Sequence, residues 1–295
     1  MEKKFTDVGA FLDTVSDLPV LPSNIQKITD IMSDESKSAE DISAVIATDQ
    51  GLTSKVLKIA NSAFYGRVSQ VVKISESVVV IGLLNIKSML YAIFMEQLYG
   101  GAKDDGNMLS SMWMHSISVA ILSQRMIEKV NPGEKDTAYT AGLLHDIGEL
   151  IIFKYEPGYF NEILGELKNE QMLPRTTIEE TIMGFTHSDL GAAMARKWSL
   201  PRAIKNAIFF HHNPVDCDSD KTVVSVVHMA DVICCASGIS GTDRKPAVKD
   251  IMKFISKEAT ENVKFGKSEI QYYLSIMGDI RAEADKLIES VKGGR

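Results

Sequence analysis

The sequence lacks a long uninterrupted apolar run, and its N-terminus lacks a basic segment followed by an apolar one. Its longest apolar stretches, such as 78–84, are far shorter than the roughly 18 residues that a membrane-spanning helix needs. The opening residues, MEKKFTDVGAFLD, do not have the pattern of a secretory signal peptide. These two absences predict a soluble, cytoplasmic protein with no membrane association.

Cysteine is scarce, and basic residues do not outnumber acidic ones. The three cysteines are Cys217, Cys234 and Cys235; none forms a CxxC motif, and neighbouring cysteines rarely pair, so a reducing compartment is expected. With 32 basic and 39 acidic residues, the formal net charge is −7 and the pI about 5.5. This balance argues against nucleic acid as a partner, because sequence-independent binding depends on basic patches. It leaves open a small phosphate-containing ligand held through a metal.

The chain of 295 residues is 45% hydrophobic and 24% charged, which is the composition of an ordinary globular protein. Along most of the chain the apolar residues recur at helical spacing. Ser38 and Asp41 form a sequence like a capping box at the start of one helix. The segment Val78–Ile81 is compatible with a strand by propensity. Because its neighbours are all helical, we favour a helix, a turn near Gly82–Asn85, and a second helix.

A Gly- and Asp-rich stretch, Tyr99–Ser111, marks the expected division of the chain. It predicts an N-terminal helical lobe over 1–105, a second lobe over 106–240, and a C-terminal helical extension over 241–295. In that extension Ser268 opens a last helix with one apolar side. Such a side either faces the core or binds a partner, and the sequence favours the core.

The segment Ala141–Phe153, AGLLHDIGELIIF, is the most informative stretch. Its apolar residues surround the axis, which predicts one helix buried on most sides, with His145 and Asp146 in its middle. A buried carboxylate is costly unless it meets a cation or strong donors. This segment therefore predicts a metal ion or a buried charge network.

The histidines are confined to one part of the chain, since none precedes residue 115 and none follows residue 228. Histidines used only for packing would be scattered, so this grouping indicates a shared site. Taken singly, each is more often a core residue than a ligand, and His228 is the one best left as structural. Together, nitrogen and oxygen donors lie on separate predicted helices, with Asp146 as the natural bridge. The candidate metal ligands are His115, His145, Asp146, His187, His211, His212 and Asp231.

Donors of this kind suit iron, manganese or zinc, and their number allows two divalent ions. The order His115, His145–Asp146, Asp231 resembles the metal set of the HD superfamily of phosphohydrolases. When His187 and His211–His212 are added, the set resembles the two-metal arrangement of the HD-GYP cyclic-dinucleotide phosphodiesterases.

A narrower resemblance covers residues 15–240. The motifs LPVLPSNIQKI, TDQGLTSKVLKIANSAFYG and VVVIGLLNIKSMLYAIF, followed by AGLLHDIGELI, HSDLGAAMARKWSLP and FFHHNP, are similar to the HDOD family, the HD-related output domain of bacterial signalling proteins. The resemblance implies an all-α fold, in which an N-terminal helical lobe packs on an HD-like lobe.

Two departures bear on activity. Where the phosphodiesterases place a lysine after His-Asp-Ile-Gly, this chain has Glu149, which is expected to repel phosphate. The double histidine is followed by NPVDCDSD and an acidic flank, Asp216, Asp218 and Asp220, in place of a Gly-Tyr-Pro loop. Cyclic-di-GMP hydrolysis is therefore not expected.

Two functional hypotheses follow, with a metal-binding nucleotide or redox sensor as a third. The first is a metal-binding regulatory module without catalysis, whose partner is a signalling protein. The alternative is a metal-dependent phosphohydrolase of a nucleotide or other phosphoester. In that scheme His115, His145, Asp146 and Asp231 hold one ion, and His187, His211 and His212 hold the second, with Asp146 bridging. A metal-bound hydroxide attacks phosphorus in line. Neither hypothesis fixes the oligomeric state.

Overall fold

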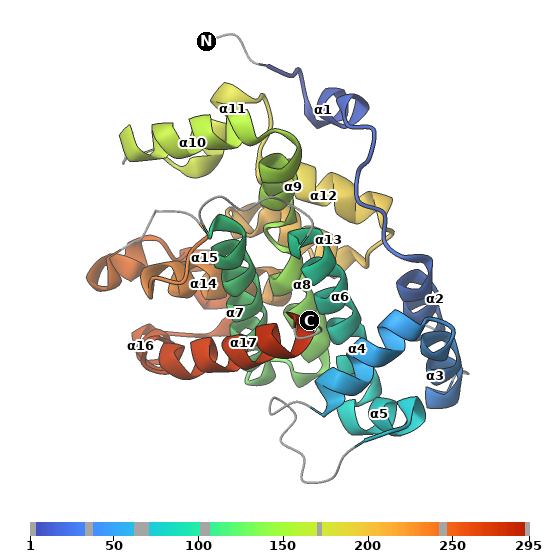
Figure 1. The fold of residues 1–295 in the computed structure, drawn as a ribbon. Coiled ribbons are helices and arrows are strands. Elements are labelled where there is room, and N and C mark those ends of the chain that lie inside the picture. Colours follow the sequence, from blue (N-terminus) through green and yellow to red (C-terminus); the bar gives the residue numbers. More distant parts are fainter. Residues whose placement is uncertain are drawn as a thin grey trace. The chain divides into compact units, whose positions relative to one another are not determined.

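The computed structural model describes residues 4–32, 38–61, 71–100, 107–169, 173–241 and 247–292. Their regular structure is entirely helical, as the sequence predicted: α-helices α1–α17 and the short 3₁₀ helices η1–η3 (Figure 1). The chain divides into two compact units. The larger comprises Met1–Pro19 and Ala102–Gly278, and the smaller Val20–Gly101 and Asp279–Arg295. Within the described part of the chain, no helix has the length and apolarity needed to cross a membrane.

The smaller unit contains the helices α2 (Ser23–Met32), α3 (Ala39–Ala47), α4 (Gln50–Ala60), α5 (Ile74–Ile81) and α6 (Leu83–Gly100), and the greater part of α17 (Met277–Lys292). The capping box of Ser38 and Asp41 is present at the start of α3. The helix, turn and second helix expected around Gly82 are also confirmed, but the turn is shorter than predicted, because α6 already begins at Leu83. Gly82, with φ of 84°, forms the turn between α5 and α6, a conformation that glycine adopts readily.

The expected last helix is two helices. A break at Ile276 separates α16 (Lys267–Ser275) from α17. The apolar side of α17 is buried, as its residues Ile280, Ala284, Leu287 and Val291 show. This burial favours the core interpretation of the stripe over the partner-binding one.

The larger unit is built around α7 (Met108–Glu128), which packs against α8 (Lys135–Leu144) and α14 (Lys221–Ala236) (Figure 1). Its other elements are α1 (Val8–Thr14), η1 (Pro132–Glu134), α9 (Ile147–Tyr155), α10 (Pro157–Asn169), α11 (Arg175–Ile182), α12 (His187–Lys197), α13 (Arg202–Phe210), η2 (Pro214–Asp216), η3 (Val248–Lys253), α15 (Lys257–Val263) and α16.

Helix α12 packs closely on α9 and α13 because glycines remove side chains at the contacts. A Cβ atom added to Gly148 would lie 1.9 Å from the main-chain oxygen of His187. A Cβ atom added to Gly191 would lie 2.7 Å from Ile208 Cγ2. Side chains at these two positions would push α12 away from α9 and α13.

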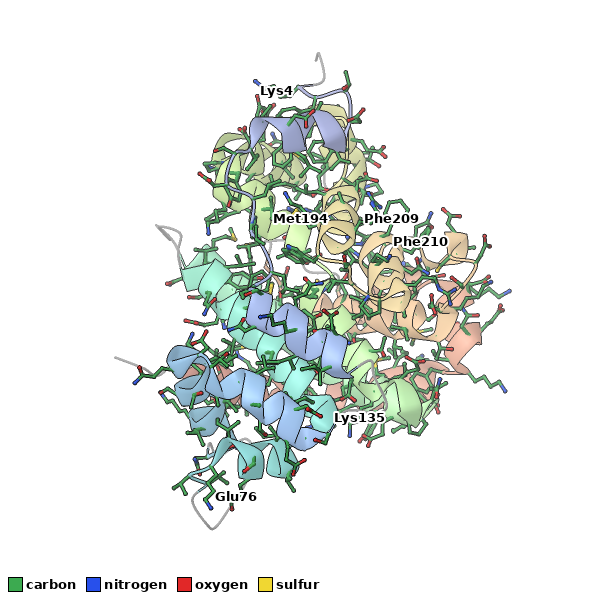
Figure 2. The ribbon with its side chains drawn as sticks, turned by 90° about the vertical axis from the view of Figure 1, so that its right-hand side faces the viewer. Lys4, Glu76, Lys135, Met194, Phe209 and Phe210 are labelled. Carbon is green, nitrogen blue, oxygen red and sulfur yellow. The ribbon has the colours of Figure 1, made fainter. Side chains whose placement is uncertain are left out.

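The first described residues run along the larger unit, with Lys4 ahead of α1 (Figure 2). The main-chain N–H of Phe5 donates to Met183 O at 3.1 Å, and the Phe5 ring contacts Phe185. Trp198 Nε1 donates to Pro19 O at 2.9 Å. These contacts assign residues 4–19 to the larger unit, whereas the sequence prediction grouped them with the lobe of 1–105.

Candidate metal centre

The stretch that the sequence predicted as one buried helix is two helices that meet at His145 and Asp146. Helix α8 ends at Leu144, Asp146 leaves the helical conformation with φ of −100° and ψ of 19°, and α9 begins at Ile147. The break brings the two side chains together, with His145 Nε2 3.2 Å from Asp146 Oδ2. The pair thus faces one site, where an unbroken helix would have separated its side chains by about 100°.

Three histidines are oriented in the same way, through Nδ1 and a main-chain carbonyl. A carbonyl oxygen only accepts, so Nδ1 carries the proton and, in the neutral ring, Nε2 is left with a bare lone pair. The contacts are His115 to Ile239 O at 2.9 Å, His145 to Gly142 O at 2.7 Å and His211 to Ile208 O at 2.8 Å. All three rings are buried, and their Nε2 atoms face the site.

The first cluster consists of His115, His145, Asp146 and Asp231. His115 Nε2 lies 3.3 Å from His145 Nε2 and 3.3 Å from Asp231 Oδ1. Helix α14 supplies Asp231, and α7 supplies His115. Four donors from three parts of the chain therefore converge.

The second cluster consists of Asp146, His187, His211 and His212. His187 Nε2 lies 3.3 Å from His211 Nε2 and 3.0 Å from His212 Nε2. His187 is the first residue of α12, whose capping box is made by Thr186 and Asp189, while the double histidine directly follows α13. The end of one helix and the start of another therefore meet at this cluster.

Asp146 belongs to both clusters because its two oxygens face opposite ways. Oδ2 lies 3.5 Å from His115 Nε2, and Oδ1 lies 3.5 Å from His187 Nε2 and 3.4 Å from His211 Nε2. The seven residues singled out in the sequence thus lie together, with Asp146 between the two groups.

The pKa values of the histidines depend on their burial and on the carboxylates beside them. Burial lowers the pKa of His115, but hydrogen bonds to Asp146 and Asp231 raise it more, and the result lies well above its usual value. For His187 the burial effect is likewise outweighed, mainly by Glu179, and the pKa rises to about 9. Burial lowers the pKa of His211, which stays neutral. At neutral pH His115 and His187 therefore favour the protonated form.

The spacing and the chemistry of these donors are those of ligands around a divalent cation. In each cluster, ligand atoms of Asp146 and its histidines all lie within 4.8 Å of one another, and adjacent ones are 3.0–3.5 Å apart. Neighbouring ligands around one ion with metal–nitrogen distances of about 2.0–2.1 Å have a similar spacing. Nitrogen and carboxylate oxygen donors match iron, manganese and zinc. The centre is accessible at His212, which is exposed, and at the partly exposed Asp146.

His228, expected to be structural, has both ring nitrogens engaged away from the clusters. Its Nδ1 donates to His211 O at 2.6 Å, and its Nε2 accepts from the main-chain N–H of Ser256 at 2.9 Å. His228 therefore holds the main chain at His211, just after α13, and so helps to orient the double histidine.

Three residues near the donors were not singled out in the sequence. Glu179 Oε2 accepts from His187 Nδ1 at 2.7 Å, and Arg175 Nε donates to Glu179 Oε1 at 2.7 Å. Cys235 Sγ donates to Asp231 Oδ1 at 3.4 Å. The Cys235 contact could be expected from the sequence, because Cys235 lies one helical turn after Asp231. Nothing in the local sequence distinguishes Glu179 or Arg175.

Glu149 does not face the site as a free negative charge. It is buried, and its Oε1 lies 3.0 Å from Arg175 Nε. Burial raises its pKa to about 7, although Arg175 acts in the opposite direction. The expected repulsion of phosphate by this residue is thus weakened, but the position still supplies no cation.

The segment around the double histidine combines aromatic and acidic side chains. Phe209 and Phe210 precede the pair, with ring centroids 4.7 Å apart, and lie at the end of α13 (Figure 2). Beyond it, Asp220 of the expected acidic flank is paired with Arg202 at 2.9 Å. The flank is therefore partly neutralised within the protein.

Comparison with known proteins identifies the family. The HDOD domain model matches residues 18–214, well over half of the chain, and the protein belongs to the HDOD family. An uncharacterized protein of Treponema pallidum (strain Nichols) is 28% identical over 226 residues, which are 76% of this chain and 43% of that protein. The chain thus spans less than half the length of this relative.

Solved structures share the fold. An HDOD domain protein with unknown function from Geobacter sulfurreducens has a TM-score of 0.79 and 26% identity, covering 95% of this chain and 96% of that one. A candidate phosphohydrolase from Shewanella amazonensis SB2B has a TM-score of 0.72 and 22% identity, covering 95% and 97%. A candidate signal transduction protein from Marinobacter aquaeolei VT8 has a TM-score of 0.75 and 18% identity, covering 93% and 60%. At their identities the last two indicate the fold alone.

Proposed function

We propose that the protein binds two divalent metal ions and acts as a metal-dependent regulatory module in bacterial signal transduction. The observation that carries the proposal is Asp146, whose two oxygens face two separate groups of histidine Nε2 atoms. The first cluster would hold one ion and the second cluster the other, with Asp146 bridging them. The ions would be iron, manganese or zinc.

Metal binding would act on the fold through the elements that it joins. The donors come from α7, the break between α8 and α9, α12, the end of α13, and α14. Ions held by these elements would stabilise the larger unit against local opening, because a ligand that binds only the folded state favours it. A signalling protein that docks on this unit could then distinguish its metal-loaded state from its metal-free state.

Two features support a regulatory role over cyclic-di-GMP hydrolysis. The residue after His-Asp-Ile-Gly is Glu149, whose carboxylate is paired with Arg175. The double histidine is followed by Asn213–Asp216, without a Gly-Tyr-Pro loop. Neither position offers the group that the phosphodiesterases use to meet phosphate.

The second candidate function is a metal-dependent phosphohydrolase acting on a nucleotide or another small phosphoester. It is favoured by the same bridging geometry of Asp146 and by the partly exposed side of the centre at His212. Two ions bridged by a carboxylate lower the pKa of water and neutralise charge on a phosphoryl group. The chain's own contribution would be to fix the donors through their Nδ1 hydrogen bonds.

The decisive experiment measures metal content. The protein would be purified without a polyhistidine tag or chelator, and bound metals quantified by mass spectrometry in the wild type and in Asp146→Ala. Near two equivalents of iron, manganese or zinc, lost in the variant, would support the proposal. A folded wild type without metal after incubation with these ions would contradict it.

A second pair of measurements separates the two functions. Turnover of nucleotides or phosphoesters above that of Asp146→Ala would favour the phosphohydrolase. A partner interaction that depends on metal loading, in a protein without such turnover, would favour the regulatory module.

A further inference from the structure

In the second cluster, a carboxylate accepts the hydrogen bond of one histidine Nδ1, that of His187, whereas in the first cluster main-chain carbonyls accept those of His115 and His145. Glu179 Oε2 accepts the Nδ1–H of His187 at 2.7 Å and the main-chain N–H of the same residue at 2.9 Å. Both side chains have no exposed surface. One carboxylate oxygen therefore fixes the ring and the backbone of His187 together, at the first residue of α12.

The carboxylate of Glu179 is itself held in place. Its Oε1 accepts from Arg175 Nε at 2.7 Å, one turn earlier on α11. The same Nε lies 3.0 Å from Glu149 Oε1 on α9, and the guanidinium carbon lies 5.7 Å from the ring centroid of Phe160. A buried chain of Glu149, Arg175 and Glu179 thus ends at His187 and joins α9, α11 and α12.

The chain affects how His187 binds a cation. An ionised carboxylate on Nδ1 fixes the tautomer that exposes Nε2 and makes that nitrogen a stronger donor. The Arg175 guanidinium, whose Nε donates to Glu179 Oε1, supplies the opposite charge that a buried carboxylate needs in order to stay ionised. In the first cluster, His115 and His145 rest on neutral carbonyls.

We propose that Glu179 is a positioning residue for the ion of the second cluster: it orients His187 and strengthens its Nε2 as a ligand, while Arg175 holds Glu179 in place. This inference rests on the proposed function, because it requires an ion at that cluster. The site nearer Asp231 does not depend on Glu179, so the two ions should respond differently to its removal.

The test is the Glu179→Gln variant, compared with Glu180→Gln, the exposed neighbour on the same helix. Each protein would be loaded with Mn²⁺ or Zn²⁺, dialysed against a series of competing chelator concentrations, and analysed for bound metal. Glu179→Gln should bind one ion like the wild type and the other about 10- to 100-fold more weakly. Glu180→Gln should retain wild-type affinity for both ions.

A Co²⁺-loaded sample gives a readout that a general loss of stability would not change. The absorption bands of the second ion should shift or disappear in Glu179→Gln, while those of the first ion remain. Cobalt titration of the His212→Ala variant identifies which bands belong to the second cluster, because His212 contacts only that cluster.

Loss of the Glu179 charge leaves Arg175 paired with Glu149 alone, which would destabilise the fold. A second variant therefore separates loss of metal from loss of folding. In the Arg175→Met, Glu179→Gln double variant the guanidinium is removed as well, and circular dichroism would verify its folding. Selective loss of the second ion from this folded protein supports the inference. Two ions bound with wild-type affinity in either folded variant overturn it. A wild type that binds no metal would instead overturn the proposed function.

Discussion

Oδ1 of Asp146 lies 3.4 Å from Nε2 of His211, so a residue of the break between α8 and α9 meets the residue that directly follows α13. Its other oxygen faces His115 and His145. A single carboxylate thus connects two groups of nitrogen donors. This relationship makes Asp146 the residue whose loss should affect both proposed ions.

Replacing Asp146 with asparagine should remove both ions, because the amide cannot bridge two cations with negatively charged oxygens. Metal content should fall from near two equivalents to near zero. Thermal unfolding of the variant should not respond to added chelator, whereas that of the wild type should shift to lower temperature. Asp285→Asn, at an exposed position of α17, is the matched control and should bind like the wild type. Retention of two ions by Asp146→Asn would refute the bridging role.

The two clusters should be separable by single histidine substitutions. His115→Ala removes a donor that contacts Asp231 and Asp146, and it should weaken the first ion. His212→Ala removes a donor of the second cluster only, and it should weaken the second ion. Metal titrations of the two variants should each show one strong site. Two strong sites in both variants would show that these histidines are not ligands.

Introducing the lysine of the phosphodiesterases at position 149 should destabilise the fold and confer no cyclic-di-GMP hydrolysis. The Glu149→Lys ammonium would lie beside the buried guanidinium of Arg175, which now lies 3.0 Å from the carboxylate. Breaking a buried ion pair costs about 3–5 kcal/mol, so the free energy of unfolding should fall by about 3 kcal/mol or more. Urea unfolding of chelator-treated protein measures this effect.

The control for that substitution is Glu162→Lys, at an exposed position of α10, which should change the free energy of unfolding by less than about 0.5 kcal/mol. Equal stability of the Glu149→Lys variant and the wild type would show that the Arg175 pairing contributes little.

Two glycine-to-alanine substitutions should have opposite effects. At Gly148 the new Cβ atom would overlap the main-chain oxygen of His187, so α9 and α12 would have to separate. Overpacking of this kind typically costs about 1–3 kcal/mol, and the displaced His187 should also bind metal more weakly. At Gly165, inside α10, a Cβ atom meets nothing within 4 Å. There alanine should stabilise the helix by up to about 1 kcal/mol.

Chemical denaturation and metal titration of both glycine variants check this prediction. If Gly148→Ala were as stable as the wild type with unchanged metal affinity, the α9–α12 contact would not be needed to place His187. A destabilised Gly165→Ala would show that helix propensity does not decide stability at that position.

The sequence by itself determined the properties that depend on local spacing and chemistry. Helical periodicity predicted helices along most of the chain, the resemblance to the HDOD family implied an all-α fold, and the Ser38–Asp41 pattern predicted a capping box that is present. The grouping of histidines and aspartates predicted which donors would share a site, and the structure brings these seven together. These features can be recognised in the sequence because the residues involved differ in chemical type from their neighbours.

Only the tertiary structure decided how those residues face one another. The apolar pattern of Ala141–Phe153 predicted one helix, because burial on all sides gives no local signal of a break at His145 and Asp146. The partners of Glu149 and His187, namely Arg175 and Glu179, come from a helix that the local sequence does not distinguish. Residues 4–19 likewise lie along the larger unit through contacts with residues far along the chain. Packing sets these pairings, since each depends on where a distant helix is positioned and not on the residues beside it.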